Sequence, residues 1–265
     1  MKLFFSDLDG TLLTSGKTIS PATKQAVDDF VNAGNIFVIS TGRALSSALK
    51  LRDHYGLNYP GSYLSSFNGG ILYDNTAEKV ISRTALPLEV VAKVQEIADE
   101  YHIYLQTYSG DYILARYDCE ELRSYMHHTN METIFADDLV LGLEDEPCKM
   151  LAIDLHDHAH LQEFRRAVED AFGGSYSIVS SEPEYVELCP PDAGKGKALE
   201  RLCGILQIPV RDSLAAGDAE NDIPMLVSAG TGIAMINASD AVKAAADVVT
   251  AEDNDHDGLL PYLQP

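Results

Sequence analysis

An apolar segment at the start of the chain ends in two closely spaced carboxylates, Asp7 and Asp9, and no other feature constrains the fold as much. Residues 2–6 predict a strand, which Gly10 interrupts. Alternate side chains of a strand point the same way, so the two carboxylates converge at its end. Burying an unpaired carboxylate is costly, which indicates a bound cation or a catalytic role. Taken alone, the segment also fits a plain turn, because Asp-Gly favours turns.

Strands and helices alternate through the first third of the chain and again in its last part. Ser20-Pro21 predicts the start of a helix that runs to Ala33 and stops at Gly34. The other predicted elements are strands at 35–40, 63–67, 70–73, 213–216, 232–235 and 247–250, and helices at 44–55, 195–206, 221–228 and 239–246. This alternation predicts a Rossmann-like parallel sheet with helices on both faces.

The pattern changes near Leu86-Pro87. Two hairpins are predicted there, one from 103–108 and 112–117 and one from 176–180 and 185–188, together with a strand at 149–155 and helices at 88–101, 120–128 and 158–172. The fold class is therefore α/β: a Rossmann-like core of residues 1–85 plus 190–265, with an inserted α/β cap of residues 86–189 that carries an antiparallel sheet.

Three further motifs stand at a strand end or a helix start. They are Ser40-Thr41-Gly42-Arg43, Gly194-Lys195-Gly196-Lys197-Ala198-Leu199 and the acidic stretch from Gly217 to Leu226. Open α/β sheets bind ligands outside the carboxyl ends of their strands. Asp7, Asp9, Thr41 and Asp218 all fall at such ends, so they are expected to share one site.

These four motifs, in this order, resemble those of the haloacid-dehalogenase superfamily. Residues 7–11 fit its DxDGT pattern, and residues 217–226 fit the GDxxNDxxML form of the Cof-like phosphatases. The layout covers nearly the whole chain, although the middle third carries no matched motif. The resemblance implies a Mg²⁺-dependent phosphatase of small phosphorylated metabolites, sugar phosphates foremost, in which the insert sets substrate choice.

The resemblance also implies the catalytic roles. Asp7 is the nucleophile that forms an aspartyl-phosphate, and Asp9 protonates the leaving oxygen and later deprotonates the attacking water. Mg²⁺ would be held by the side chains of Asp7 and Asp218 and the backbone carbonyl of Asp9, since it prefers oxygen ligands. Dehalogenase members lack the second aspartate, so Asp9 favours phosphoryl transfer.

Several polar residues are candidates for binding the phosphoryl group. Thr41 and Gly42 offer a hydroxyl and backbone N–H groups, although threonine is also a common helix N-cap. Arg43 is either a substrate ligand or a surface residue. Lys195 stands at a helix start, where the dipole disfavours lysine, and this indicates a phosphate partner. Lys197 competes with it, but the family pattern falls on Lys195.

The acidic motif adds Asn221 and Asp222, one helical turn beyond Asp218. Asn221 is expected to contact phosphate or a metal-bound water. Asp222 is expected behind the ligands, holding Lys195 or the metal waters. Helix capping is the alternative role for either residue.

Three other features are not assigned to the site. Residues 156–160 hold three histidines between a strand and a helix and are interpreted as a solvated loop. The acidic stretch 253–258 lacks the ligand spacing of a calcium loop and is expected to cap the last helix. Asn68-Gly69 is interpreted either as a turn near the site or as a plain tight turn.

The composition limits the partners. The net charge of −22 argues against nucleic acid and anionic membranes. No stretch is long enough to span a membrane, the N-terminus has no room for a signal peptide, and the four cysteines make no CxxC pair, so free thiols and a cytoplasmic location are expected. The sequence assigns no oligomeric state.

Two other functions compete with the phosphatase. A phosphomutase or sugar-phosphate transferase could use the same core, and a non-catalytic sensor could bind a phosphorylated ligand. The complete motif set argues against the sensor, because a binding protein has no need of Asp9.

Overall fold

The structure, a computed structural model, describes residues 1–264. It divides into two compact units. The first contains Met1–Gly42, Ala48–Ser82 and the residues from Gly194 onward, and the second contains Arg43–Ser47 and Arg83–Ala193. The insert expected at residues 86–189 lies within the second unit.

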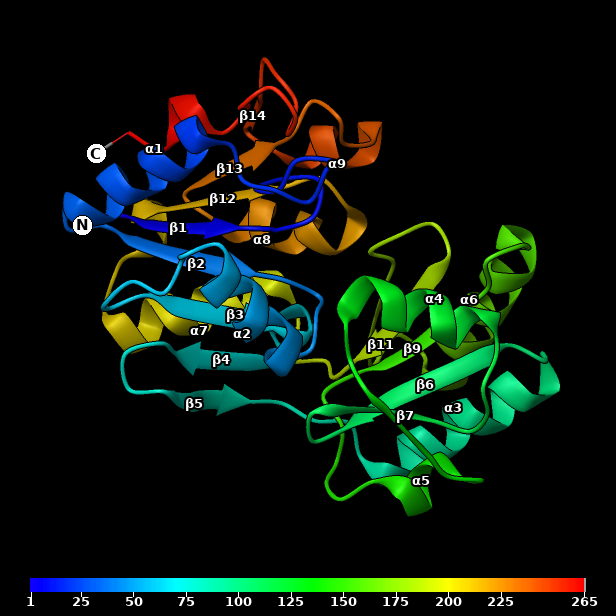
Figure 1. The fold of residues 1–265 in the computed structure, drawn as a ribbon. Coiled ribbons are helices and arrows are strands. Elements are labelled where there is room, and N and C mark those ends of the chain that lie inside the picture. Colours follow the sequence, from blue (N-terminus) through cyan, green and yellow to red (C-terminus); the bar gives the residue numbers. More distant parts are fainter. Residues whose placement is uncertain (265) are drawn as a thin grey trace. The chain divides into compact units, whose positions relative to one another are not determined.

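The first unit is built on an eight-stranded sheet in the order β14-β13-β12-β1-β2-β3-β4-β5 (Figure 1). The strands are β1 (Leu3–Ser6), β2 (Ile36–Ser40), β3 (Tyr63–Ser66), β4 (Ile71–Asp74), β5 (Lys79–Arg83), β12 (Ser213–Gly217), β13 (Thr231–Ala234) and β14 (Val248–Val249). Neighbouring strands from β14 to β3 are parallel, and β4 pairs antiparallel with β3. The predicted Rossmann-like sheet is confirmed, and β5 is a strand that the sequence did not predict.

Helices cover both faces of this sheet (Figure 1). They are α1 (Pro21–Asn32), α2 (Leu45–His54), α7 (Lys195–Leu206), α8 (Ile223–Ser228) and α9 (Asp240–Ala245), with short 3₁₀ turns η1 (Phe67–Gly69), η2 (Val210–Asp212), η3 (Glu220–Asp222) and η4 (Leu260–Tyr262). Phe5 of β1 belongs to the core that includes α7 and α8. Its neighbour Phe4 contacts Phe30 of α1 and stacks on Phe37 of β2. The central strand β1 is therefore buried on both sides, as its continuous apolar run requires.

The second unit contains a six-stranded sheet in the order β10-β11-β9-β6-β7-β8. Its elements are α3 (Leu88–Glu100), β6 (Tyr104–Ser109), β7 (Tyr112–Ala115), α4 (Glu120–Thr129), β8 (Thr133–Phe135), α5 (Leu139–Gly142), β9 (Met150–Ile153), α6 (His158–Phe172), β10 (Ser177–Val179) and β11 (Tyr185–Cys189). Both predicted hairpins are antiparallel, as expected. The sequence missed β8, which pairs parallel with β7, and α5.

The two faces of the second sheet differ in chemistry. Apolar side chains of α3, α5 and α6 pack on one face in a continuous core. A buried polar layer includes an ion pair between Lys149 and Glu187, with Nζ to Oε2 at 3.2 Å. In the same layer the Tyr108 and Tyr125 hydroxyls lie 2.6 Å apart. These two tyrosines therefore pack within the second unit.

Two loops that the sequence analysis did not assign to the site form hydrogen bonds at the starts of helices. Asp157 accepts a hydrogen bond from His160 N at 3.0 Å and caps α6, which accounts for part of the histidine-rich loop. Asp257 accepts hydrogen bonds from Ser20 and Thr23 at the start of α1. The expectation that residues 253–258 cap the last helix is wrong. Asp257 in this loop instead accepts hydrogen bonds from residues at the start of the first helix, α1.

All four cysteines are free, as predicted, and three of them are buried. Within residues 1–264, no helix has the length and apolar character needed to cross a membrane.

The aromatic contacts of β1 predict a large loss of stability on truncation. Phe4→Ala removes a fully buried ring and its contacts with Phe30 and Phe37, and we expect a loss of about 3–5 kcal/mol in the free energy of unfolding. Ile205→Ala on α7, where the side chain is 51% exposed, is the control and should change it by less than about 0.5 kcal/mol. Urea unfolding followed by circular dichroism measures both values. A Phe4→Ala loss as small as that of the control would contradict the packing.

Candidate active site

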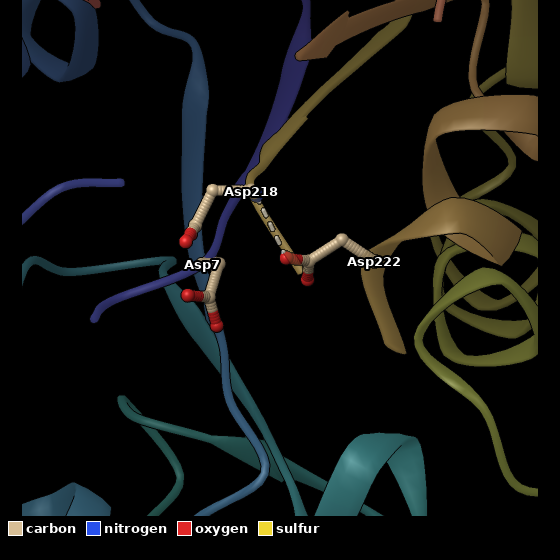
Figure 2. A group of neighbouring side chains, drawn as sticks. All are labelled: Asp7, Asp218 and Asp222. Atoms are coloured by element: carbon tan, nitrogen blue, oxygen red, sulfur yellow. Dashed lines mark hydrogen bonds between the residues drawn. The ribbon is translucent and has the colours of Figure 1, made fainter. Parts of the chain in front are cut away.

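Three carboxylates meet at the carboxyl end of the central strands (Figure 2). Asp7 directly follows β1, Asp218 directly follows β12, and Asp222 ends η3. The two strands are neighbours in register, with Ser6 opposite Ala216, so their ends bring Asp7 and Asp218 together. Each carboxylate offers an oxygen within 4.8 Å of the others, which is close enough to hold one metal ion.

Lys195 joins two of these carboxylates. As the first residue of α7, it donates from Nζ to Asp7 Oδ1 and to Asp222 Oδ1, both at 2.5 Å. The residue is only 1% exposed. Burial lowers the pKa of Lys195, but the charges of Asp222 and Asp7 outweigh burial and raise the pKa above its ordinary value. Lys195 is therefore a fixed positive charge within the cluster.

Asp222 also fixes the loop that carries Asp218. Its Oδ2 accepts hydrogen bonds from the backbone N–H groups of Asp218 and Ala219, each at 3.0 Å. Both oxygens of Asp222 are thus engaged within the protein. Asp7 and Asp218 are consequently the better placed pair for a metal ion, with Asp222 behind them.

The loop after β1 approaches Asp218 closely. Thr11 Oγ1 donates to Asp218 Oδ1 at 2.6 Å. Gly10 has a φ of +77°, and a Cβ added there would come within 2.4 Å of Asp218 Oδ2. Only glycine fits this backbone conformation and this close approach without displacing the carboxylate.

The ionised form of Asp7 is disfavoured within the cluster. Burial raises the pKa of Asp7 well above its usual range, and the charges of Asp222 and Asp218 raise it further, while Lys195 opposes them. One lysine faces three carboxylates here, so the cluster is short of positive charge. A bound divalent cation would supply that charge.

A second set of polar groups lies around Asn68, which η1 holds in the left-handed region at φ +52°. Asn68 N donates to Thr41 O at 3.1 Å, and Gly194 N donates to Asn68 O at 2.7 Å. Asn221 Nδ2 donates to Asn68 Oδ1 at 2.9 Å. The buried Asn221 Oδ1 has no hydrogen-bond partner among residues 1–264, and such a group usually faces a ligand or water.

Two predicted site residues, Asp9 and Arg43, form hydrogen bonds with residues outside the carboxylate cluster. Asp9 lies in the loop after β1, and its Oδ1 accepts from Lys17 Nζ at 2.7 Å. Arg43 belongs to the second unit, where its Nη1 donates to the backbone oxygen of His128 at 3.1 Å. Gly42 directly follows Thr41 at the end of β2 within the first unit.

Three residues of this neighbourhood were not predicted as site residues. Thr11 belongs to the DxDGT pattern, which could have identified it, and Asn68 was interpreted as part of a turn, either near the site or plain, without an assigned role. Lys17 carried no signal in the sequence, because it stands outside every motif.

Comparison with known proteins gives the class. The model of the haloacid dehalogenase-like hydrolases matches residues 4–263. A 5-amino-6-(5-phospho-D-ribitylamino)uracil phosphatase of Bacillus subtilis, YwtE, is 28% identical, covering 99% of this chain and 97% of the relative. The pyridoxal phosphate phosphatase YbhA of Escherichia coli is 29% identical, with 97% and 95% covered. The crystal structure of a haloacid dehalogenase-like hydrolase from Bacteroides thetaiotaomicron superposes with a TM-score of 0.86 at 28% identity, covering 99% of this chain and 98% of that one.

The chain belongs to the haloacid dehalogenase-like hydrolase family. Within it the chain is a phosphatase, a phosphoric monoester hydrolase, in line with its relatives.

The charge imbalance predicts that the Asp7 carboxylate destabilises the metal-free protein. Because the pKa of Asp7 is raised on folding, the native state binds a proton more tightly than the unfolded state, and stability falls as pH rises above the unfolded value. We expect Asp7→Asn to raise the free energy of unfolding of metal-free protein at pH 7 by about 1 kcal/mol. The gain should vanish near pH 4, where the unfolded carboxylate also takes up its proton. Urea unfolding with EDTA at the two pH values measures it, and a loss of stability at pH 7 would contradict the prediction.

Proposed function

We propose that the protein is a Mg²⁺-dependent phosphatase of small phosphorylated metabolites, with sugar phosphates as the first class to test, acting through an aspartyl-phosphate on Asp7. One observation carries the proposal: the buried Asp7 carboxylate is bonded to Lys195 and lies beside Asp218 at a strand end. The relatives named as phosphatases of a phosphoribityl compound and of pyridoxal phosphate support the substrate class.

Two steps account for the hydrolysis. Asp7 Oδ2 attacks phosphorus, the bond from phosphorus to the leaving oxygen breaks, and Asp9 gives that oxygen a proton. Water then attacks the phosphorus of the aspartyl-phosphate while the Asp9 carboxylate takes the water proton. The bond between phosphorus and Asp7 breaks, inorganic phosphate leaves, and both aspartates return to their starting states.

The donor set fits Mg²⁺. We assign its ligands to the side chains of Asp7 and Asp218 and to the backbone carbonyl of Asp9, because hard oxygen donors suit this ion and the cluster lacks positive charge. When bound, the ion offsets the negative charges of the phosphoryl group and of the carboxylates. Asp222 would act from behind by holding Lys195 and the Asp218 loop.

The phosphoryl group would be held by protein donors. We assign this role to Lys195, to the Thr41 hydroxyl and the Gly42 N–H, and to Asn221, with Arg43 as a further candidate. The shared contacts of Thr41 and Asn221 with Asn68 support their common placement in the first unit.

The partners follow from the charge and the fold. We propose that the insert of residues 86–189 sets substrate choice, since the proposed catalytic residues lie outside it. The net charge of −22 disfavours nucleic acid and anionic membranes as partners. The free cysteines fit the reducing cytoplasm, which is the location we propose.

The nucleophile gives the direct test. Asp7→Asn should lower kcat for p-nitrophenyl phosphate by at least about a thousandfold, because an amide cannot form the acyl-phosphate. Asp29→Ala on the exposed side of α1 is the control and should keep full activity. Circular dichroism shows whether both variants are folded. A folded Asp7→Asn protein with near wild-type kcat would remove Asp7 as the nucleophile.

Metal removal gives an independent test. EDTA should abolish hydrolysis of p-nitrophenyl phosphate, and added Mg²⁺ should restore it, because the carboxylate cluster otherwise repels the phosphoryl group. Asp218→Ala should raise the Mg²⁺ concentration for half-maximal activity by at least about tenfold. Full activity in metal-free buffer would refute the metal assignment.

A further inference from the structure

The Asp9 side chain forms an ion pair with Lys17, a residue that lies outside every motif. The Lys17 ammonium lies 2.7 Å from Asp9 Oδ1, and the two side chains are 54% and 24% exposed. Isolated surface ion pairs contribute little to stability, so stability alone does not explain this pair. Its partner, however, is the residue that we propose as the acid and base.

The backbone at Lys17 is held in an uncommon conformation. Its φ is +54°, in the left-handed region that favours glycine, whereas the adjacent Gly16 does not adopt a positive φ. Lys17 N donates to Thr14 O at 2.8 Å, and Thr14 N donates to Thr18 O at 2.8 Å, which closes a short turn. A lysine occupies the position of this turn where a glycine would fit most easily.

Contacts from elsewhere in the first unit fix the turn. The Tyr55 hydroxyl, just after α2, donates to Lys17 O at 2.5 Å. On the other side, Ser15 donates through its backbone N and its hydroxyl to Asp255, both at 2.7 Å. The turn is therefore held at both ends, and these contacts fix the point at which the Lys17 side chain leaves the backbone.

The negative charge near Asp9 gives the ion pair with Lys17 a role. Asp9 stands two residues after Asp7, which forms a cluster with Asp218 and Asp222. Like charges at short range repel, so an unassisted Asp9 carboxylate would turn away from them. Lys195 already serves Asp7 and Asp222, and Lys17 gives Asp9 a cation of its own.

We propose that Lys17 is a positioning residue that holds Asp9 Oδ1, so that Asp9 Oδ2 faces the leaving oxygen and the attacking water. This inference rests on the acid–base role proposed for Asp9. It predicts that loss of Lys17 harms the steps that use Asp9 and leaves the rest of the reaction intact.

Two aryl phosphates separate this role from a purely structural one. Phenyl phosphate and p-nitrophenyl phosphate present the same ring, but nitrophenolate leaves without needing a proton and phenolate depends on one. Lys17→Met should lower kcat/KM for phenyl phosphate about tenfold and should change that for p-nitrophenyl phosphate by less than about twofold. Lys17→Arg keeps the charge and should recover most of the loss.

Control variants account for folding and for general charge effects. Lys197→Met removes an equally exposed lysine, paired with Glu200, and should leave both substrates unaffected. Lys17→Gly removes the side chain but suits the left-handed backbone, so it should fold well and reproduce the Lys17→Met pattern. A loss of the same size on both substrates would overturn the proposal.

A double variant tests whether Lys17 acts through Asp9. In an Asp9→Asn background, Lys17→Met should cause no further loss on phenyl phosphate, whereas a lysine that binds substrate directly would lower activity again. If Asp9→Asn is as active as the wild type, the proposed acid–base role itself fails. If Asp9→Asn is impaired and Lys17→Met is not, only the role of Lys17 fails.

Discussion

The site depends on one buried ammonium group. Lys195 lies between Asp7 and Asp222, which come from the first strand and from the 3₁₀ turn after β12, while the lysine itself begins α7. Removing Lys195 would leave both carboxylates without their shared cation, and an unpaired buried charge typically costs about 3–5 kcal/mol. The pairing therefore fixes the start of α7 against the end of the central strand. Carboxylates and a lysine that are far apart in the sequence thereby lie together in space.

That same cluster contains more negative than positive charge. The raised pKa of Asp7 expresses the imbalance, because burial and two neighbouring carboxylates disfavour its ionised form. A fold selected for stability alone would place an apolar residue or a second cation there. In the function that we propose, a bound Mg²⁺ ion would offset this excess of negative charge, so metal binding would draw on the same electrostatic imbalance.

Most of the fold could be predicted because its elements are long and strongly patterned. The buried strand β1 and the capped helix α1 have clear signals, and Ser20 accepts from Thr23 N at 3.0 Å as its N-cap position predicts. The missed elements lack such signals. The strand β8 has three residues, two of them exposed, and α5 has four, too few for any periodicity to develop. Such short elements form because their neighbours in the sheet and core hold them.

The reactive groups of the site were easier to predict than the groups that hold them. Asp7 and Asp218 follow buried strands directly, so local sequence fixes where they lie once the sheet forms. Lys17 differs, because its left-handed backbone accepts a hydrogen bond from Tyr55, 38 residues away. Asn68 likewise meets Asn221 across 153 residues. The residues around the carboxylates are positioned by tertiary contacts of this kind, so a sequence that identifies the proposed nucleophile at once can still conceal the residue that we propose as the one orienting Asp9.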